Sequence, residues 1–66
     1  MKIYELKGAA YRLFQWTKSR FGILTAAYVE AALCEGVPLR SECLLRGVFD
    51  AIVEQANALE VVIPTE

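Results

Sequence analysis

The sequence contains no histidine and only two cysteines. Histidine is the side chain that most often acts as a general base near neutral pH, so its absence disfavours acid–base catalysis. Ser19 and Ser41 are the only serines, and neither stands in the G-x-S-x-G turn of a seryl nucleophile. No G-x-G-x-x-G pattern and no phosphate-binding loop is present. These absences predict a protein that is not an enzyme and that binds no cofactor.

The two cysteines, Cys34 and Cys43, are too few for a structural metal site. Such a zinc site takes four ligands from cysteine, histidine or carboxylate, and two cysteines supply half of them. We therefore predict no bound metal. The favoured interpretation is two free thiols in a reducing cytoplasm, and the alternative is a disulfide between the end of one helix and the start of the next.

Long apolar runs are also missing. The most apolar stretch runs from Phe21 to Cys34, and it is shorter than the roughly 20 residues that a helix needs to cross a bilayer. It is also interrupted by Thr25 and Glu30. Two charges break residues 1–6, which is unlike a signal peptide. These features predict a cytoplasmic protein with no membrane partner.

The length of 66 residues predicts a single small domain that spans residues 1–66. At 56%, the apolar fraction is higher than the roughly 45–50% of average proteins. A domain of this length buries only about 60% of its unfolded surface, so its interior is too small for so many apolar side chains. We expect part of the apolar surface to lie in an interface, most simply that of a homodimer.

Three apolar patterns predict an all-α domain of three helices with short extended N- and C-terminal segments. The first has spacings of three and four residues and predicts a helix over residues 8–20. The second predicts a helix over Thr25–Glu35, with Thr25 as its N-cap and Gly36 just past its end. Because this second segment is apolar nearly all round, we expect a central helix that is covered on several sides.

The third pattern is the clearest of the three. A polar and an apolar stripe run in parallel from residue 42 to residue 59, and the predicted helix starts at Ser41 or at Pro38. The spacing of the polar residues predicts ion pairs of Arg46 with Glu42 and with Asp50. The apolar stripe consists of Leu45, Val48, Ile52, Ala56 and Leu59.

Both ends of the chain are predicted to be extended. Val61, Val62 and Ile63 form a short β-type segment that Pro64 stops. If residues 2–6 are extended as well, the two ends can pair as a small β-ribbon, either within one chain or between subunits.

Basic and aromatic residues are concentrated near the N-terminus. The first 21 residues carry five basic and one acidic side chain, a net charge of +4, and the remaining 45 carry two basic and seven acidic ones, a net charge of −5. An exposed tryptophan beside arginines is typical of protein-binding hot spots, and such a patch favours an acidic partner surface. The residues of this predicted contact patch are Trp16, Arg12, Lys18 and Arg20.

A second hypothesis concerns residues 32–46. Ala32, Gly36 and Val37 have the spacing found at the turn of helix-turn-helix domains. Glu42 stands where such motifs place an apolar residue, and the acidic third helix opposes binding to phosphates. The residues that this hypothesis places in the DNA major groove are Arg40, Ser41 and Arg46.

The favoured function is therefore a small non-enzymatic regulator, inhibitor or adaptor that binds another protein and forms a homodimer. The alternative is a small DNA-binding transcriptional regulator that uses residues 36–46 or the basic first helix. DNA binding would weaken steeply with salt, whereas protein binding would depend on Trp16.

Overall fold

Three α-helices form the fold, and the computed structural model describes residues 7–66 of the chain. The helices are α1 (Gly8–Phe21), α2 (Ile23–Glu35) and α3 (Val48–Ala58), and a short 3-10 turn, η2 (Ser41–Cys43), precedes α3. No β-strand occurs within the described residues. The prediction of an all-α domain of three helices is confirmed.

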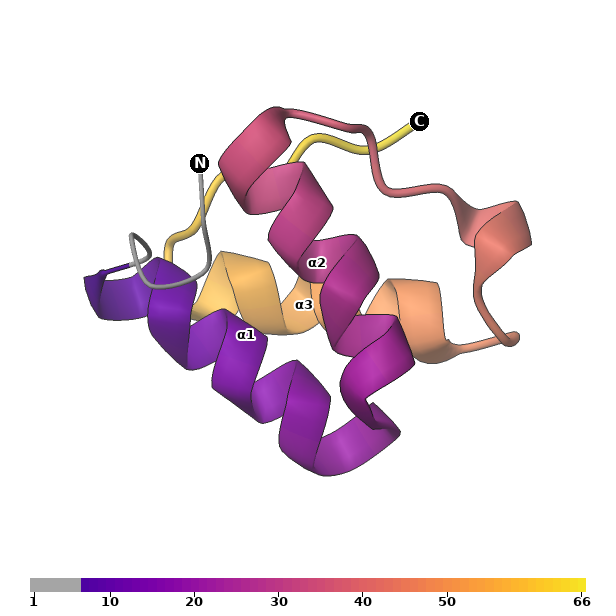
Figure 1. The fold of residues 1–66 in the computed structure, drawn as a ribbon, viewed down its shortest axis with the longest axis horizontal. Helices are drawn as coiled ribbons and strands as arrows, with labels where there is room; N and C mark the ends of the chain where they lie inside the picture. Colours follow the sequence, from indigo (N-terminus) through magenta and orange to yellow (C-terminus); the bar gives the residue numbers. More distant parts are fainter. Residues whose placement is uncertain (1–6) are drawn as a thin grey trace.

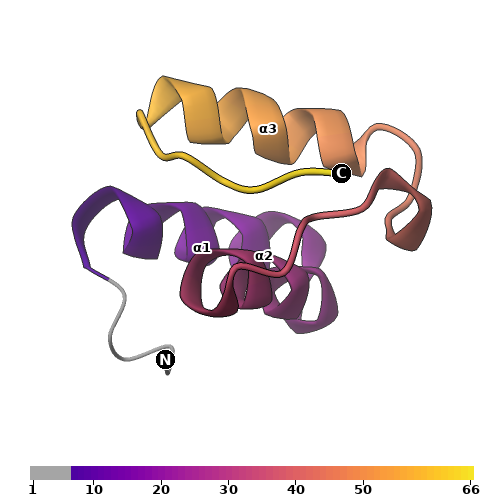
Figure 2. The same cartoon turned by 90° about the horizontal axis from the view of Figure 1, so that it is seen from above.

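The helices are arranged in two layers. α1 and α2 run antiparallel, side by side, in one layer, and α3 lies over them in the second (Figures 1 and 2). Within residues 7–66, α3 rests mainly on α1, so no helix covers the side of α2 that faces away from α1. The C-terminal segment turns back along α3 and ends near the connection between α2 and η2 (Figure 1).

A single residue, Gly22, connects α1 to α2. Its φ of 97° is easily adopted only by glycine, and its amide donates a hydrogen bond to the carbonyl of Lys18 at 3.0 Å. The turn is complete before Ile23, so α2 begins there, two residues before the predicted N-cap. The prediction that Thr25 caps α2 is wrong, whereas the predicted end at Gly36 is confirmed.

The core is small and lies where the three helices meet. Leu13 of α1, Val29 of α2 and Ile52 of α3 are fully buried and belong to one cluster. Leu39, from the connection after α2, joins the same cluster. Thr17 is the only buried polar residue among those described, and its hydroxyl donates to the carbonyl of Leu13 at 2.8 Å. The core therefore holds three helices and one connection together as a unit.

α3 begins later than predicted. Gly47 has a φ of 88°, a conformation that interrupts a helix, and it separates η2 from α3. The prediction of a continuous helix that starts between residues 38 and 41 is therefore wrong. The predicted ion pairs of Arg46 with Glu42 and Asp50 are likewise absent from the described part of the chain, because these residues do not share one helix.

Several large apolar side chains lie outside the core. Leu45, which the pattern places on an inner helix face, projects from the segment before Gly47 and is 80% exposed. On α2, Ile23, Leu24 and Tyr28 are 58%, 80% and 46% exposed. The prediction that α2 is a central helix covered on several sides is wrong, because α3 packs on α1 and leaves one side of α2 open.

The C-terminal segment pairs with the connection after α2. The Leu39 amide donates to the carbonyl of Pro64 at 2.8 Å, and the Glu66 amide donates to the carbonyl of Leu39 at 3.0 Å. These two bonds form an isolated parallel bridge between Leu39 and Thr65. The predicted ribbon between this segment and the N-terminal segment lies outside the described residues.

We expect Ile52→Val to lower the free energy of unfolding by about 0.5–1.5 kcal/mol, because it removes a methylene from a fully buried site. Val62 is 93% exposed and provides a control, since Val62→Ala should change the free energy of unfolding by less than about 0.5 kcal/mol. Urea unfolding followed by circular dichroism measures both. Equal effects of the two substitutions would contradict the assignment of the core.

Candidate functional site

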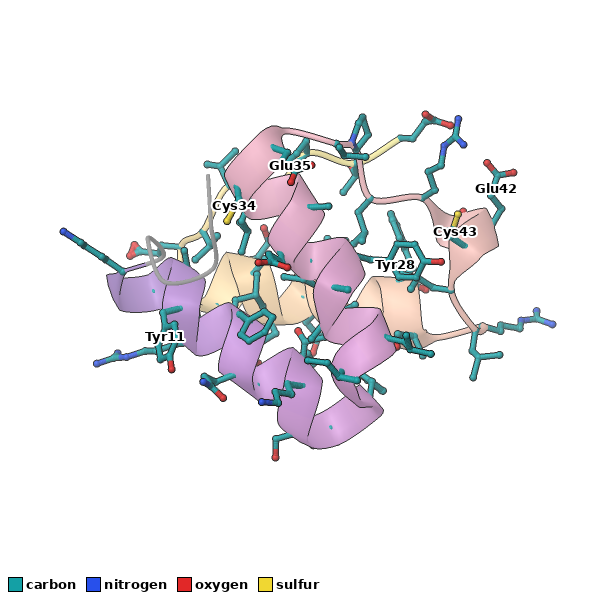
Figure 3. The ribbon with its side chains drawn as sticks, in the orientation of Figure 1. Tyr11, Tyr28, Cys34, Glu35, Glu42 and Cys43 are labelled. Carbon is teal, nitrogen blue, oxygen red and sulfur yellow. The ribbon has the colours of Figure 1, made fainter. Side chains whose placement is uncertain are left out.

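An open groove of about 800 Å³ lies between α2 and the segment that joins η2 to α3. One wall is the side of α2 that no other helix covers, and the other wall is residues 42–48. Figure 3 shows Tyr28 projecting from α2 across this space, toward the segment that carries Cys43. The residues that line the groove are Phe21, Leu24, Thr25, Ala27, Tyr28, Ala31, Glu42, Cys43, Leu44, Leu45 and Val48.

The groove is mainly apolar and has an exposed leucine on each wall. Leu24 on α2 and Leu45 on the opposite wall are each 80% exposed, and Tyr28 is 46% exposed. Ala27 and Ala31 lie one turn apart on α2, and their small side chains allow another chain to approach the helix closely. A contiguous exposed apolar patch of this kind is a feature of interaction sites and ligand-binding grooves.

Charged side chains of both signs border the groove. Glu42 lines it, and a carboxylate oxygen of Glu42 lies 3.7 Å from Nε of Arg40. Arg46 and Asp50 line a smaller depression on the other side of Leu45. Arg46 is exposed and forms no ion pair within residues 7–66. The apolar centre is thus flanked by both negative and positive charge.

Arg40 is held by the C-terminal segment. Its Nε donates to a carboxylate oxygen of Glu66 at 3.0 Å, and Glu42 lies slightly farther away. The hydrogen bond from Arg40 to Glu66 and the charge of Glu66, followed by the charge of Glu42, raise the pKa of Arg40 above its ordinary value. The guanidinium therefore stays charged and is already paired with carboxylates of its own chain.

The helix that the DNA hypothesis needs is not formed. Arg40, Ser41 and Arg46 lie in or beside η2, and α3 starts only at Val48. No helix within the described residues carries these three side chains toward a major groove, and Arg40 is engaged by its own chain. The helix predicted to start at Pro38 or Ser41 and to carry Arg46 is not formed, and DNA binding itself stays a prediction.

A second candidate surface, the α1 stripe, consists of Arg12, Trp16 and Arg20. These residues follow one another at intervals of four and share one side of the helix. Cζ of Arg20 lies 5.7 Å from the centre of the Trp16 ring, which meets the Phe21 ring edge-on at 5.6 Å. Trp16 is half-buried and packs against the core, so only part of its ring is exposed for contact. Lys18 lies about 200° around the helix from Trp16 and is not part of the stripe.

α1 carries positive charge that nothing in the described structure neutralises. Its sequence contains Arg12, Lys18 and Arg20 and no acidic residue. None of the three forms an ion pair with another residue of the range 7–66. Lys18 and Arg20 also lie in the last turn, where cations are favoured by the helix dipole. The stripe therefore keeps its charge available for an acidic partner.

The cysteines occupy different places. Cys43 has an exposed free thiol and lines the groove. Cys34 lies near the end of α2, well apart from Cys43 (Figure 3). The alternative interpretation of a disulfide between these two residues is therefore wrong.

Leu24, Tyr28 and Leu45 are the candidate binding residues that the sequence patterns did not predict. The nearly continuous apolar surface of α2 was the available signal, since such a helix needs cover on two sides. In this domain α1 covers one side of α2, and α3 packs mainly on α1 and leaves the other side of α2 open. The groove is the uncovered remainder.

No known protein-family profile, curated protein or solved structure matches this chain. Within residues 7–66, no helix combines the length and the hydropathy that crossing a membrane requires. The same residues bring together no group of three His, Cys, Asp or Glu side chains that could hold a metal ion. The groove and the α1 stripe are therefore the two candidate binding surfaces of the described residues.

We expect Gly47→Ala to lower the free energy of unfolding by about 1–2 kcal/mol, because alanine is strained at the φ of 88° found there. Apart from the adjacent residues, no atom of the described chain lies within 4 Å of the added Cβ, so the cost comes from the backbone conformation. Urea unfolding of the variant and the wild type measures this difference. An unchanged free energy would contradict the left-handed conformation of residue 47.

Proposed function

We propose that this chain is a small non-enzymatic regulator, inhibitor or adaptor that binds another protein and acts as a homodimer in the cytoplasm. The observation that carries the proposal is the groove, in which Leu24 and Leu45 are each left 80% exposed. Removing apolar surface from water is the main favourable term in protein association. A binding partner therefore stabilises this surface more than solvent does.

The α1 stripe supports a second contact, with an acidic protein. Trp16 offers an aromatic anchor, and Arg12 and Arg20 on either side offer positive charge. Complementary charge steers a partner to the site and penalises partners of the wrong sign. Two copies of this cationic stripe would repel one another, so the stripe suits a different protein and not a second copy.

Charge reversal on α1 tests the stripe. Arg12→Glu and Arg20→Glu are each expected to weaken partner binding about tenfold, because repulsion replaces attraction. Lys18→Glu makes the same change of charge on another side of the same helix and should leave binding nearly unchanged. The measurement is photo-crosslinking in the producing cells from a photoreactive residue at Ser19, which is exposed beside the stripe, with the adducts quantified by mass spectrometry.

The three variants also separate the outcomes. An acidic protein that is lost from the adducts in the two arginine variants and retained in Lys18→Glu supports the proposal. Equal loss in all three would indicate attraction by total charge, with no defined site. No adduct from Ser19 in any sample would overturn the assignment of the stripe.

The cations of α1, which form no ion pair within residues 7–66, also keep the DNA alternative testable. If α1 binds DNA, affinity for a short duplex will fall steeply between low and moderate salt, and Arg12→Glu or Arg20→Glu will flatten that dependence. Arg40→Ala and Arg46→Ala report on the segment around η2 in the same titration. Specific, salt-dependent duplex binding by the wild type would replace the protein-binding proposal.

A further inference from the structure

The groove needs an occupant, and its charge restricts the choice. In a two-fold symmetric dimer the same patch is used by both subunits, so a patch of one charge sign would repel itself. The side of α2 in the groove contributes no charge, since Leu24, Ala27 and Tyr28 are all uncharged. Among the described residues, Glu42 is the only charged one that lines the groove, and it lies 3.7 Å from Arg40. Apart from Glu42, the lining of two facing copies of this groove therefore brings no charges together.

The border of the groove is complementary to itself. Glu42 lies on one side of Leu45 along the chain, and Arg46 follows Leu45 directly. Arg46 forms no ion pair in the structure of residues 7–66. In a two-fold symmetric interface, every contact between two different residues occurs twice. Glu42 of each subunit can therefore face Arg46 of the other. Polar borders of this kind commonly surround the apolar centre of an interface.

Leu45 has the shape that the groove can accept. It stands 80% exposed on a wall that is only partly covered, next to an open volume of about 800 Å³. The far wall is α2, where Ala27 and Ala31 leave room for an incoming side chain. The protruding leucine and the groove lie side by side on the same surface. In a two-fold symmetric dimer, the leucine of each subunit can therefore insert into the groove of the other.

The size of the domain favours the same occupant. Eight apolar side chains of the described residues are buried, so the core of the isolated chain is small. Domains of this length often need oligomerisation to be stable. An ordinary interface covers about 800 Å² of each partner, less than a fifth of the 4498 Å² that this chain exposes. A second copy of the chain therefore has enough surface to cover the groove and its border.

We propose that the groove is filled by a second copy of this chain in a two-fold symmetric dimer. Leu45 of each subunit enters the groove of the other, against Leu24 and Tyr28, and Glu42 of each faces Arg46 of the other. This inference rests on the homodimer of the proposed function and assigns its surface. It leaves the α1 stripe of both subunits free for an acidic partner.

Molar mass in solution tests the proposal. Light scattering after size-exclusion chromatography, over a wide range of concentration, is expected to show a dimer for the wild type. Leu24→Glu and Leu45→Glu should each raise the dissociation constant at least about thirtyfold, as expected for residues at the centre of an interface. Val62→Glu is the matched control, because Val62 is 93% exposed, lies outside the groove and should leave the dimer intact.

A charge-swap cycle tests the symmetry of the contact. Glu42→Arg and Arg46→Glu are each expected to weaken the dimer about tenfold, because each places like charges opposite one another. The double variant restores opposite charges and should return the dissociation constant to near the wild-type value. Additive weakening in the double variant would overturn the pairing of Glu42 with Arg46.

Wild-type protein provides a test that does not depend on folding of a variant. Cys43 lines the groove, so a short thiol cross-linker should join two chains through Cys43, and Cys43→Ser should abolish the product. A monomeric wild type, or a dimer that survives both leucine variants and is not cross-linked through Cys43, would overturn this inference. Partner adducts from Ser19 that persist in those cases would leave the protein-binding proposal standing.

Discussion

The limited interior of this domain determines most of its other features. Nine of the described side chains are buried, and one cluster among them joins the three helices to the connection after α2. A core of that size forms where α1, α2 and α3 meet, and it cannot extend around the far side of every helix. Because α3 rests on α1, α2 is the helix that stays partly uncovered, and its Leu24 and Tyr28 remain exposed to solvent. The groove is the direct result of an apolar chain with too few helices to cover itself.

Charge divides the exposed surface into two kinds. α1 carries three cations and no acid, while the side of α2 in the groove is uncharged. A cationic surface selects partners of opposite charge, and a neutral apolar surface selects by shape and hydrophobicity. Under the proposals made for the two surfaces, self-association and partner binding would use separate areas. A chain of 66 residues would then carry two contacts without competition between them.

Local patterns predict α1 and the end of α2 because the deciding interactions are close in sequence. The spacing of Leu13 and Thr17 defines the inner side of α1, and Gly36 ends α2 through its own backbone. Gly47 differs, because a glycine within a helical pattern costs only about 1 kcal/mol and the pattern alone does not show that it interrupts the helix. The exposure of Leu45 follows from that interruption. The exposure of Leu24 follows from the packing of α3 on α1. Both depend on contacts between distant segments, so the α1 residues of the candidate site were predictable and the groove was not.

The bridge at Leu39 affects the order in which the chain can complete its fold during synthesis. α1 and α2 are joined by local contacts and can associate once residue 35 has been made. Leu39 belongs to the core, yet its amide and carbonyl bond to Pro64 and Glu66. At a synthesis rate of about 5–20 residues per second, those partners appear roughly one to five seconds after Leu39. Until residues 64–66 reach Leu39, the amide and carbonyl of this core residue lack these two partners, so this part of the core closes after the α1–α2 hairpin.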